Sequence, residues 1–360
     1  MEKQEEAFNF LKDNFYHYIF MKKLNVLVAG ATGYIGIQLV KLLVKHKYVN
    51  IKYLCGSTSA GKKISYFDKD LKKKKLPKII KFNHSLLKDV SVVFTALPNG
   101  EAQTVSNQLN DENILIDLAA DFRLNKASEY LKWYKLKHKA KKNISKSIYA
   151  LPEIVGNKIK NYKIISCPGC YPTSILIPLI PLIKNRLIKT KNIIIDSKSG
   201  YSGAGKGVHK KYKNHNLYES LKAYGIFKHR HNSEVKNELR KHTNKNVDFV
   251  FTPHLSPMFR GILTTIYLDL NRNINVNKIQ NYLKKFYKKS QFVKIEKLNT
   301  LLSTNDVINT NLCKIALHKS KKSNKLIVLS AIDNLIKGGS GQAIQNMNIK
   351  YNFPKGHGLT

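Results

Sequence analysis

The 360-residue chain has few cysteines and no long apolar run. Its four cysteines are irregularly spaced and too few for a disulfide framework in a chain of this length, which favours a reducing compartment and predicts a cytoplasmic protein. The most apolar stretch, residues 174–183, contains two prolines and is much shorter than the roughly 20 residues of a membrane helix. We therefore expect a buried core segment there and no membrane association.

Acidic residues are also scarce: 23 Asp and Glu stand against 63 Lys and Arg, which gives a formal charge of +40. Such a charge raises the alternative of a nucleic-acid-binding protein, because basic surfaces bind phosphate. The lysines are scattered along the whole chain, with short runs such as 72–75 and 319–322. We interpret this as a compositional bias over an ordinary fold and expect no specific nucleic-acid partner.

The first twenty residues contain four acidic residues, no arginine and no apolar core. This composition fits neither a mitochondrial transit peptide nor a signal peptide. A second methionine, Met21, leads directly into the first predicted strand. We therefore treat residues 1–20 as a tail outside the fold.

From Met21 onward, strand and helix patterns alternate. Residues 24–29 and 51–54 read as strands, and residues 34–45 carry apolar side chains at helical spacing. Later strands are expected over 90–97 and 114–118. This βαβ order predicts an α/β fold with a doubly wound, mostly parallel sheet that binds a dinucleotide, over residues 21–168.

After Cys170 the pattern changes. Longer strands, which we expect to be antiparallel, are predicted over 193–196, 248–252 and 261–270. The helices expected in this part of the chain are 232–242 and 276–288. We assign residues 169–335 to a second, α+β domain, and expect residues 336–360 to form a helix that returns to the first domain.

A glycine-rich turn follows the first strand and opens the first helix, with Gly30, Gly33 and Gly36 in the sequence Gly-Ala-Thr-Gly-Tyr-Ile-Gly. Such a turn brings backbone N–H groups against a pyrophosphate. After the second strand an NAD enzyme usually carries an acidic residue, whereas this chain has Ser57 and Ser59, with lysines following. Hydroxyl and ammonium groups suit a 2′-phosphate, so we predict NADP(H). The residues of the turn assigned to the cofactor are Gly30, Thr32, Gly33, Tyr34, Ile35 and Gly36.

Cys170 lies in the sequence Cys-Pro-Gly-Cys-Tyr-Pro-Thr, between a short apolar run and a long one. A thiolate is stabilised at a helix N-terminus, so the position suits a nucleophile. Cys167 and Cys170 also form a CxxC pair, which leaves a thioredoxin-like motif or half of a zinc site as alternatives. No second CxxC exists to complete a zinc site, and we expect no metal.

Together the motifs resemble the N-acetyl-gamma-glutamyl-phosphate reductase family. They occur in the family's order and cover the chain from Met21 to its end: the glycine turn, Leu97-Pro-Asn-Gly100, Asp117 to Arg123, Pro168 to Thr173, Ser199 to Lys206, His229-Arg-His231 and Ala331 to Asn334. The resemblance implies a Rossmann-like NADP-binding domain and a catalytic and dimerisation domain like that of aspartate-semialdehyde dehydrogenase. It also implies reduction of N-acetyl-L-glutamyl 5-phosphate by NADPH in arginine biosynthesis.

The resemblance assigns roles to individual residues. It implies that Cys170 forms a thioester and that His229 or His231 is the acid/base, with no basis in the sequence for choosing between them. The residues expected to contact substrate are Arg123, Glu234 and Ser199, with Arg123 binding phosphate, and further cofactor contacts are expected from Pro98, Gly203 and Asn334. The chain is expected to form a homo-oligomer, a dimer or a tetramer.

Three alternatives remain at this point. A related reductase of aspartyl or amino-adipyl phosphate would share these motifs. A non-catalytic dinucleotide-binding module would need the glycine turn but neither Cys170 nor the histidine pair. A basic nucleic-acid-binding protein is the third.

Overall fold

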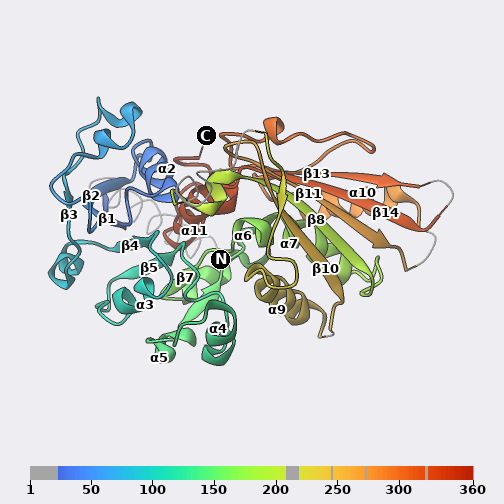
Figure 1. Ribbon diagram of the computed structural model, residues 1–360, viewed down its shortest axis with the longest axis horizontal. Coiled ribbons are helices and arrows are strands. Elements are labelled where there is room, and N and C mark those ends of the chain that lie inside the picture. Colours follow the sequence, from blue (N-terminus) through green and yellow to red (C-terminus); the bar gives the residue numbers. More distant parts are fainter. Residues whose placement is uncertain (1–22, 208–218, 245, 272–273, 321–322, 360) are drawn as a thin grey trace, which may run out of the picture.

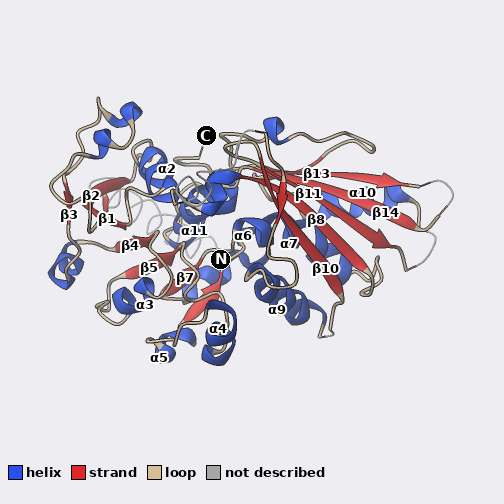
Figure 2. Ribbon diagram, in the orientation of Figure 1, coloured by secondary structure: helices blue, strands red, loops and turns tan. Residues whose placement is uncertain are grey.

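The computed structural model describes residues 23–207, 219–244, 246–271, 274–320 and 323–359. Two β-sheets lie side by side along the long axis of the molecule, with helices between and around them (Figures 1 and 2). The prediction of an α/β chain with a parallel sheet followed by a different, mixed sheet is confirmed. The predicted tail, residues 1–20, lies outside the described residues.

All seven strands of the first sheet run parallel, in the order β3-β2-β1-β4-β5-β7-β6. They are β1 (Leu24–Ala29), β2 (Val49–Cys55), β3 (Ile79–Ile80), β4 (Val92–Thr95), β5 (Ile114–Asp117), β6 (Ser147–Tyr149) and β7 (Ile164–Ser166). β4 is buried along its whole length, as expected for a parallel strand covered on both faces. The strand order reverses between β1 and β4, which places a ligand crevice at their carboxyl ends.

Short helices connect these strands. They are α2 (Tyr34–Leu43), α3 (Glu101–Ser106), α4 (Ala127–Tyr134), α5 (Lys141–Ile144) and α6 (Pro152–Val155). Four 3₁₀ turns accompany them: η1 (Ile64–Tyr66), η2 (Lys69–Leu71), η3 (His84–Asp89) and η4 (Gly156–Asn161). α2 buries Leu39, Val40 and Leu43 at the predicted helical spacing and ends two residues before the predicted Lys45. It therefore packs one apolar face against the sheet and leaves its N-terminus at the crevice.

The second sheet has the order β12-β13-β14-β11-β8-β10-β9. Its strands are β8 (Ile193–Gly200), β9 (Lys222–Ala223), β10 (Phe249–Ser256), β11 (Ile262–Asp269), β12 (Val293–Ile295), β13 (Cys313–Lys319) and β14 (Lys325–Ile332). β11 is antiparallel to β8, as predicted, and also to β14. β8 and β10 are parallel to each other, which corrects the expectation that these strands are antiparallel. The reason is the long crossover between them, which includes a helix.

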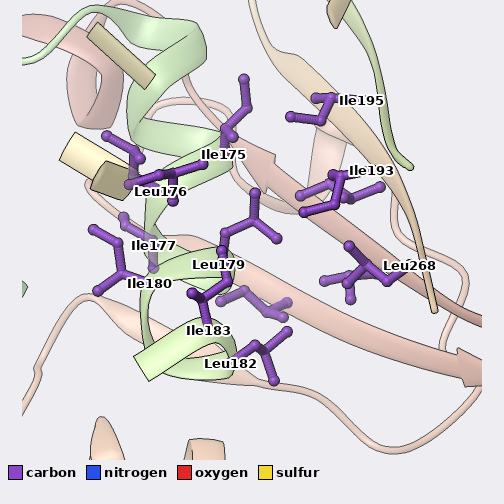
Figure 3. Packing of buried hydrophobic residues seen from close by; sticks show 14 of the residues in the cluster. Ile175, Leu176, Ile177, Leu179, Ile180, Leu182, Ile183, Ile193, Ile195 and Leu268 are labelled. Carbon is purple, nitrogen blue, oxygen red and sulfur yellow. The ribbon is translucent and has the colours of Figure 1, made fainter. Parts of the chain in front are cut away.

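Three helices cover one face of this sheet: α7 (Cys170–Lys184), α9 (His231–Thr243) and α10 (Val276–Phe286). Ile175, Leu179 and Leu182 of α7 lie on the side of the helix that faces Ile193, Ile195 and Leu268 of the sheet, whereas Ile177 and Ile180 lie on its other side (Figure 3). α7 contains two prolines, and Pro181 cannot donate a hydrogen bond to the Ile177 carbonyl. The Tyr287 hydroxyl donates to that carbonyl instead, at 2.5 Å.

The opposite face of the second sheet carries exposed apolar side chains. Ile194, Val250 and Tyr267 are each about two-fifths or more exposed and lie on β8, β10 and β11. They alternate with buried residues on the same strands, so no layer formed by the described residues covers this face. Within the described residues, no helix has both the length and the apolar character to cross a membrane.

The chain ends in a π-helix, η7 (Ile336–Ser340), followed by α11 (Gly341–Lys350). α11 is almost entirely buried and contacts α2, β5 and η4, so the end of the chain lies against the first sheet (Figure 1). Lys337 of η7 is fully buried and its Nζ lies 2.5 Å from Oε1 of Glu153 on α6. A buried ion pair therefore fixes η7 to the helices of the first sheet.

Candidate active site

Cys170 is the first residue of α7 and follows the carboxyl end of β7 by a short turn. It is half-buried, whereas Cys55, Cys167 and Cys313 are buried. Burial raises the pKa of the Cys170 thiol to about 11, although the Arg123 guanidinium and the backbone N–H of Tyr171 lower it. The thiol is thus protonated at neutral pH before a ligand binds, and a neighbouring base is needed to form the thiolate.

Cys167 differs from Cys170 in environment. Its carbonyl accepts a hydrogen bond from Nε of Arg123, and its sulfur accepts one from Asn346. Burial raises the pKa of Cys167 to about 12. All four cysteines are free thiols, and among the described residues no group of three or more His, Cys, Asp and Glu side chains is arranged to hold a metal.

His231 is the first residue of α9 and lies against the turn that carries Cys170. A Cβ added at Gly169 would lie only 2.4 Å from Nε2 of His231, so glycine at this position lets the ring approach. Nδ1 of His231 is buried and has no partner among the described residues. Burial lowers the pKa of His231 well below 6.5, with His229 and Arg123 adding to the effect, so the ring is a neutral base at neutral pH.

His229 lies next to His231 and supports it. The backbone N–H of His231 donates to Nδ1 of His229 at 3.1 Å, which fixes Nδ1 of His229 as an acceptor. The two rings are 4.7 Å apart, and His229 also makes edge contacts with Tyr171 and Tyr224. Burial lowers the pKa of His229 to about 4.

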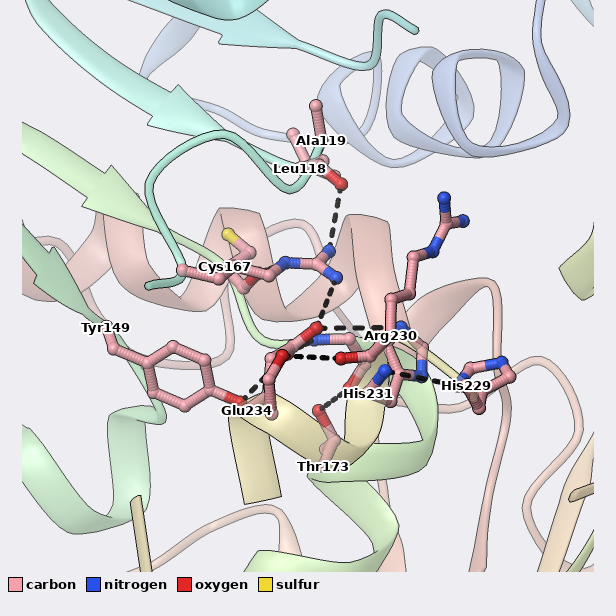
Figure 4. A network of polar contacts seen from close by, with 12 residues as sticks. Leu118, Ala119, Tyr149, Cys167, Thr173, His229, Arg230, His231 and Glu234 are labelled. Carbon is pink, nitrogen blue, oxygen red and sulfur yellow. Dashed lines mark hydrogen bonds and ion pairs between the residues drawn. The ribbon is translucent and has the colours of Figure 1, made fainter. Parts of the chain in front are cut away.

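Glu234, one turn along α9, is fully buried beneath the site (Figure 4). Its carboxylate accepts hydrogen bonds from Arg123 at 3.0 Å, from the Gly169 backbone N–H at 3.0 Å and from the Tyr149 hydroxyl at 3.2 Å. Nε2 of His231 lies 3.7 Å from the same carboxylate. Both oxygens of Glu234 thus accept hydrogen bonds from protein donors, which position the turn before Cys170. The substrate contact expected from the sequence stays a prediction.

The guanidinium of Arg123 makes three hydrogen bonds within the protein. Its Nη1 donates to Glu234, its Nε to the Cys167 carbonyl at 2.8 Å, and its Nη2 to the Leu118 carbonyl at 3.2 Å. A guanidinium has five N–H groups, so one N–H remains on each terminal nitrogen. Arg123 lines a cavity that also reaches Cys170, so these two groups are available to a ligand.

Two cavities meet at Cys170. The first, about 340 Å³, runs along the glycine turn and is lined by residues 33–36, residues 202–206, Leu97 and Asn334; we call it the glycine-turn cavity. The second, about 350 Å³, is lined by Trp133, Tyr224, Lys228, His229 and Leu255 among others; we call it the Trp133 cavity. Cys170, Gly203, Ala204, Arg230 and His231 border both cavities. A ligand held in one cavity can therefore react at Cys170 with a group held in the other.

The glycine turn fits a dinucleotide. Gly30 has φ +81°, and a Cβ on Gly36 would lie 2.1 Å from the Gly30 carbonyl oxygen, so the turn requires glycine at both positions. The N-cap residue of α2, Gly33, makes no side-chain cap, and the first turn carries no acidic residue. The N-terminus of α2 thus presents the positive end of the helix dipole, which suits a pyrophosphate.

The other predicted cofactor residues lie in varied positions. Ser57 is exposed, while Ser59 is buried beneath Gly56 with an unpartnered hydroxyl. Asn334 lines the glycine-turn cavity, although its amide already bonds to Ser202 and Gly261, and Gly203 lies beside it. Gly30, Thr32 and Pro98, also predicted to contact the cofactor, do not line that cavity. Ser199, predicted to contact the substrate, lines the Trp133 cavity.

Sequence reasoning missed several residues of the site. Arg230 is exposed, lines both cavities and points away from the buried ion pair in Figure 4. In the sequence, its position between His229 and His231 could have identified it. Gly338 was also missed: a Cβ there would lie 2.7 Å from Cβ of Cys170, so the π-helix packs directly against the nucleophile candidate.

Comparisons with known proteins agree with this geometry. Residues 25–162 match the family model described as semialdehyde dehydrogenase, NAD binding domain, and residues 170–334 match semialdehyde dehydrogenase, dimerisation domain. The chain is 42% identical over 349 residues to the N-acetyl-gamma-glutamyl-phosphate reductase of Thermoanaerobacter pseudethanolicus, covering 93% of this chain and 98% of that protein. It is 37% identical to a probable chloroplastic N-acetyl-gamma-glutamyl-phosphate reductase of Oryza sativa, covering 94% of this chain and 81% of that protein.

Solved structures of similar fold are aspartate-semialdehyde dehydrogenases. The enzyme II of Vibrio cholerae has a TM-score of 0.67 at 15% identity, covering 91% of this chain and 98% of that one. The Candida albicans enzyme, solved with NADP, has a TM-score of 0.63 at 18% identity, covering 92% and 99%. At these identities the likeness concerns the fold alone.

Proposed function

The chain belongs to the N-acetyl-gamma-glutamyl-phosphate reductase family and is therefore an NADP-dependent acyl-phosphate reductase of arginine biosynthesis, in which we propose that Cys170 is the nucleophile. The reaction converts N-acetyl-L-glutamyl 5-phosphate and NADPH to N-acetyl-L-glutamate 5-semialdehyde, phosphate and NADP. The observation that carries the assignment of Cys170 is its position: it is a half-buried thiol at the start of α7, where the two cavities meet.

The chemistry follows from the neighbours of this thiol. His231 accepts the thiol proton through its unpartnered Nδ1, and the sulfur attacks the acyl-phosphate carbonyl and expels phosphate to leave a thioester. Bound NADPH supplies the hydride that reduces this thioester. The resulting thiohemiacetal collapses to the aldehyde and returns the thiol. We assign the acid/base role to His231 and a supporting role to His229, because His231 borders both cavities and His229 borders one.

Two arginines are available to phosphate. Arg123 offers one N–H on each terminal nitrogen, and Arg230 is exposed at the junction of the cavities. A guanidinium matches the geometry of phosphate oxygens. We propose that Arg123 binds the transferred phosphate from its fixed position, and that Glu234 holds Arg123 and Gly169 in place without touching the substrate.

The cofactor is NADP(H), and the structure suggests which groups favour it. Ser57 and Thr58 are exposed after β2, Lys62 and Lys63 follow, and no carboxylate stands at the end of that strand. We expect kcat/KM for NADPH to exceed that for NADH by about tenfold or more, since a 2′-phosphate gains charge-assisted hydrogen bonds. Initial rates with the two cofactors test this, and a preference for NADH would overturn the assignment of these residues.

The chain contains a dimerisation domain. We propose that the dimer, or a tetramer built from it, forms through the open face of the second sheet that carries Ile194, Val250 and Tyr267. We also propose that the first sheet with residues 21–168 is the NADP-binding domain, residues 169–335 the catalytic domain, and residues 336–360 a returning C-terminal segment. Free cysteines throughout suit a cytoplasmic location.

The reverse reaction tests the function. Purified enzyme is given N-acetyl-L-glutamate 5-semialdehyde, inorganic phosphate and NADP, and formation of NADPH is followed by its absorbance. We expect a rate that depends on phosphate and is at least about a hundredfold greater in kcat/KM than with aspartate semialdehyde. Faster use of aspartate semialdehyde or of an amino-adipate semialdehyde would move the enzyme to that alternative substrate.

A further inference from the structure

The Trp133 cavity has a composition that the reaction steps above do not explain. Trp133, Tyr224 and Leu255 give it an apolar wall, and Lys228 and Arg230 give it positive charge. No aspartate or glutamate is among the described residues that line it. The N-terminus of α2 borders the glycine-turn cavity, which we assign to the dinucleotide. The Trp133 cavity therefore remains for the acyl part of the substrate.

Trp133 comes from a different part of the chain than most other residues that line this cavity. It belongs to α4, on the first sheet, whereas Tyr224, Lys228 and Leu255 belong to the second part of the chain. It is half-buried, and its indole N–H has no hydrogen-bond partner among the described residues. An indole presents both an apolar face and a single donor, which suits a ligand with a methyl group beside a carbonyl.

The helix that carries Trp133 is held firmly. The rings of Tyr130 and Tyr134, on the same helix, stack with their centroids 4.7 Å apart. The Tyr130 hydroxyl donates a hydrogen bond to the Asp121 carboxylate at 2.5 Å. Asn237 of α9 donates to Glu129 of α4 at 2.7 Å, which links this helix to the one that begins at His231. The indole is therefore placed in a fixed position relative to the reacting centre.

We propose that Trp133 is the residue that selects the N-acetyl group, packing its ring on the acetyl methyl and directing its N–H at the acetyl carbonyl, while Lys228 and Arg230 bind the substrate α-carboxylate. The charge of the cavity supports this. A substrate with a free α-ammonium group would place it beside two cations with no carboxylate to pair with, which is costly in a partly buried site. Acetylation removes that charge, so the cavity accepts the amide. This proposal rests on the proposed function.

The test compares two substrates in matched variants. kcat/KM is measured in the reverse direction for N-acetyl-L-glutamate 5-semialdehyde and its N-formyl analogue, which lacks the methyl group. The enzymes are the wild type, Trp133→Phe, Trp133→Ala and Leu131→Ala; Leu131 is exposed on the same helix and lines neither cavity. The wild type should prefer acetyl over formyl by about tenfold.

We expect Trp133→Ala to lower kcat/KM for the acetyl substrate by about a hundredfold, mainly through KM, and to bring the acetyl-to-formyl preference close to one. Trp133→Phe should fall between, because it keeps an apolar ring and loses the N–H. KM for NADP and phosphate should stay within about twofold, and Leu131→Ala should match the wild type. An undiminished acetyl preference in Trp133→Ala would overturn the proposal.

A direct binding measurement separates the proposal from the function. Trp133 is the single tryptophan of the chain, so its fluorescence reports only this cavity. N-acetyl-L-glutamate should change the emission saturably, and L-glutamate at the same concentration should not. Competitive inhibition by N-acetyl-L-glutamate without an emission change would count against Trp133 alone, whereas a wild type inactive with the acetylated semialdehyde would remove the proposed function itself.

Discussion

The two halves of the site are built by different means. The glycine-turn cavity is shaped by backbone: Gly30 with its positive φ, Gly36 packed on the Gly30 carbonyl, and the uncapped start of α2. The half around Cys170 is shaped by side chains, chiefly the network of Arg123, Glu234 and His231. Backbone geometry is set by local sequence, while the side-chain network depends on residues more than one hundred positions apart, such as Arg123 and Glu234, 111 positions apart.

This difference predicts two kinds of defect. Changes on the side-chain half should affect the chemical step and leave cofactor affinity intact, because the glycine turn does not depend on the network. Changes on the backbone half should weaken NADPH binding first. The substitutions below test that separation in order of expected effect.

The largest effect is expected from Cys170→Ala. Loss of the nucleophile should lower kcat by about 10⁴-fold or more, because no thioester forms. NADPH affinity, measured by titration calorimetry, should stay within about twofold of the wild type.

Cys167→Ala is the matched control, since Cys167 lies three residues away, is buried and borders the same cavity. It should keep most of the activity. Turnover by Cys170→Ala near the wild-type rate would show that the covalent mechanism is wrong.

Gly36→Ala should give the opposite defect. Its Cβ would lie 2.1 Å from the Gly30 carbonyl oxygen, so the turn must shift. We expect KM for NADPH to rise by about a hundredfold, with kcat at saturating NADPH reduced less than tenfold. Gly207→Ala is the control, because a Cβ there would lie more than 4 Å from any atom that the structure describes beyond the neighbouring residues. A variant with normal NADPH affinity and reduced kcat would contradict the division between the two halves.

Arg123→Lys should have a smaller effect on the side-chain half. Lysine keeps the charge but cannot reach Glu234, the Cys167 carbonyl and the Leu118 carbonyl together. We expect kcat/KM for phosphate in the reverse direction to fall by about ten- to a hundredfold, and unfolding free energy to fall by about 1–3 kcal/mol. NADP binding should change little. An unchanged dependence on phosphate would show that Arg123 has only its structural contacts.

The smallest effect that we expect is a loss of folding stability at acidic pH. Burial lowers the folded pKa of five histidines below 6.5: His229 and His231 in the side-chain half, and His242, His46 and His138 elsewhere. Between the folded and unfolded pKa values the unfolded chain binds more protons, so this stabilisation is complete above pH 6.5 and is lost as the pH falls toward 4.

Two buried carboxyl groups oppose this trend, because burial raises the pKa of Asp117 and of Glu238 to about 7. Five histidines favour unfolding as the pH falls and two carboxyl groups oppose it. We therefore expect the free energy of unfolding to decrease on acidification. Urea unfolding midpoints at pH 7.5, 6 and 5 measure it, and His242→Gln should reduce the slope. Stability that rises toward pH 5 would mean that the carboxyl groups dominate.

The sequence was sufficient for the features that local chemistry determines. The glycine turn, the helix from Tyr34 and the parallel sheet follow from residue spacing, and the fold class, family and cofactor predicted from these motifs are confirmed. The strand direction of β8 relative to β10 was predicted wrongly, because periodicity reports which residues are buried and not which way a neighbouring strand runs.

The sequence identified the main residues of the side-chain half but not the contacts among them. Glu234 was named from the sequence, and the folded chain adds that Arg123 and Gly169 donate to its two oxygens. The Lys337 and Glu153 pair joins residues 184 positions apart, and nothing in either local sequence indicates its partner. Such pairings arise from how the two sheets are placed together.

The π-helix has a consequence for the order in which the enzyme is made. Gly338 packs against Cys170, and the apolar residues Ile336, Ile344 and Met347 belong to the core of the first sheet, yet all four are synthesised after every strand of both sheets. A nascent chain that has been made only as far as β14 therefore holds Cys170 beside an incomplete core. Its thiol acquires its surroundings only after residues 336–347 have been added, and deleting residues from 336 onward should leave an inactive protein even though the glycine turn and the Cys170 turn are both intact.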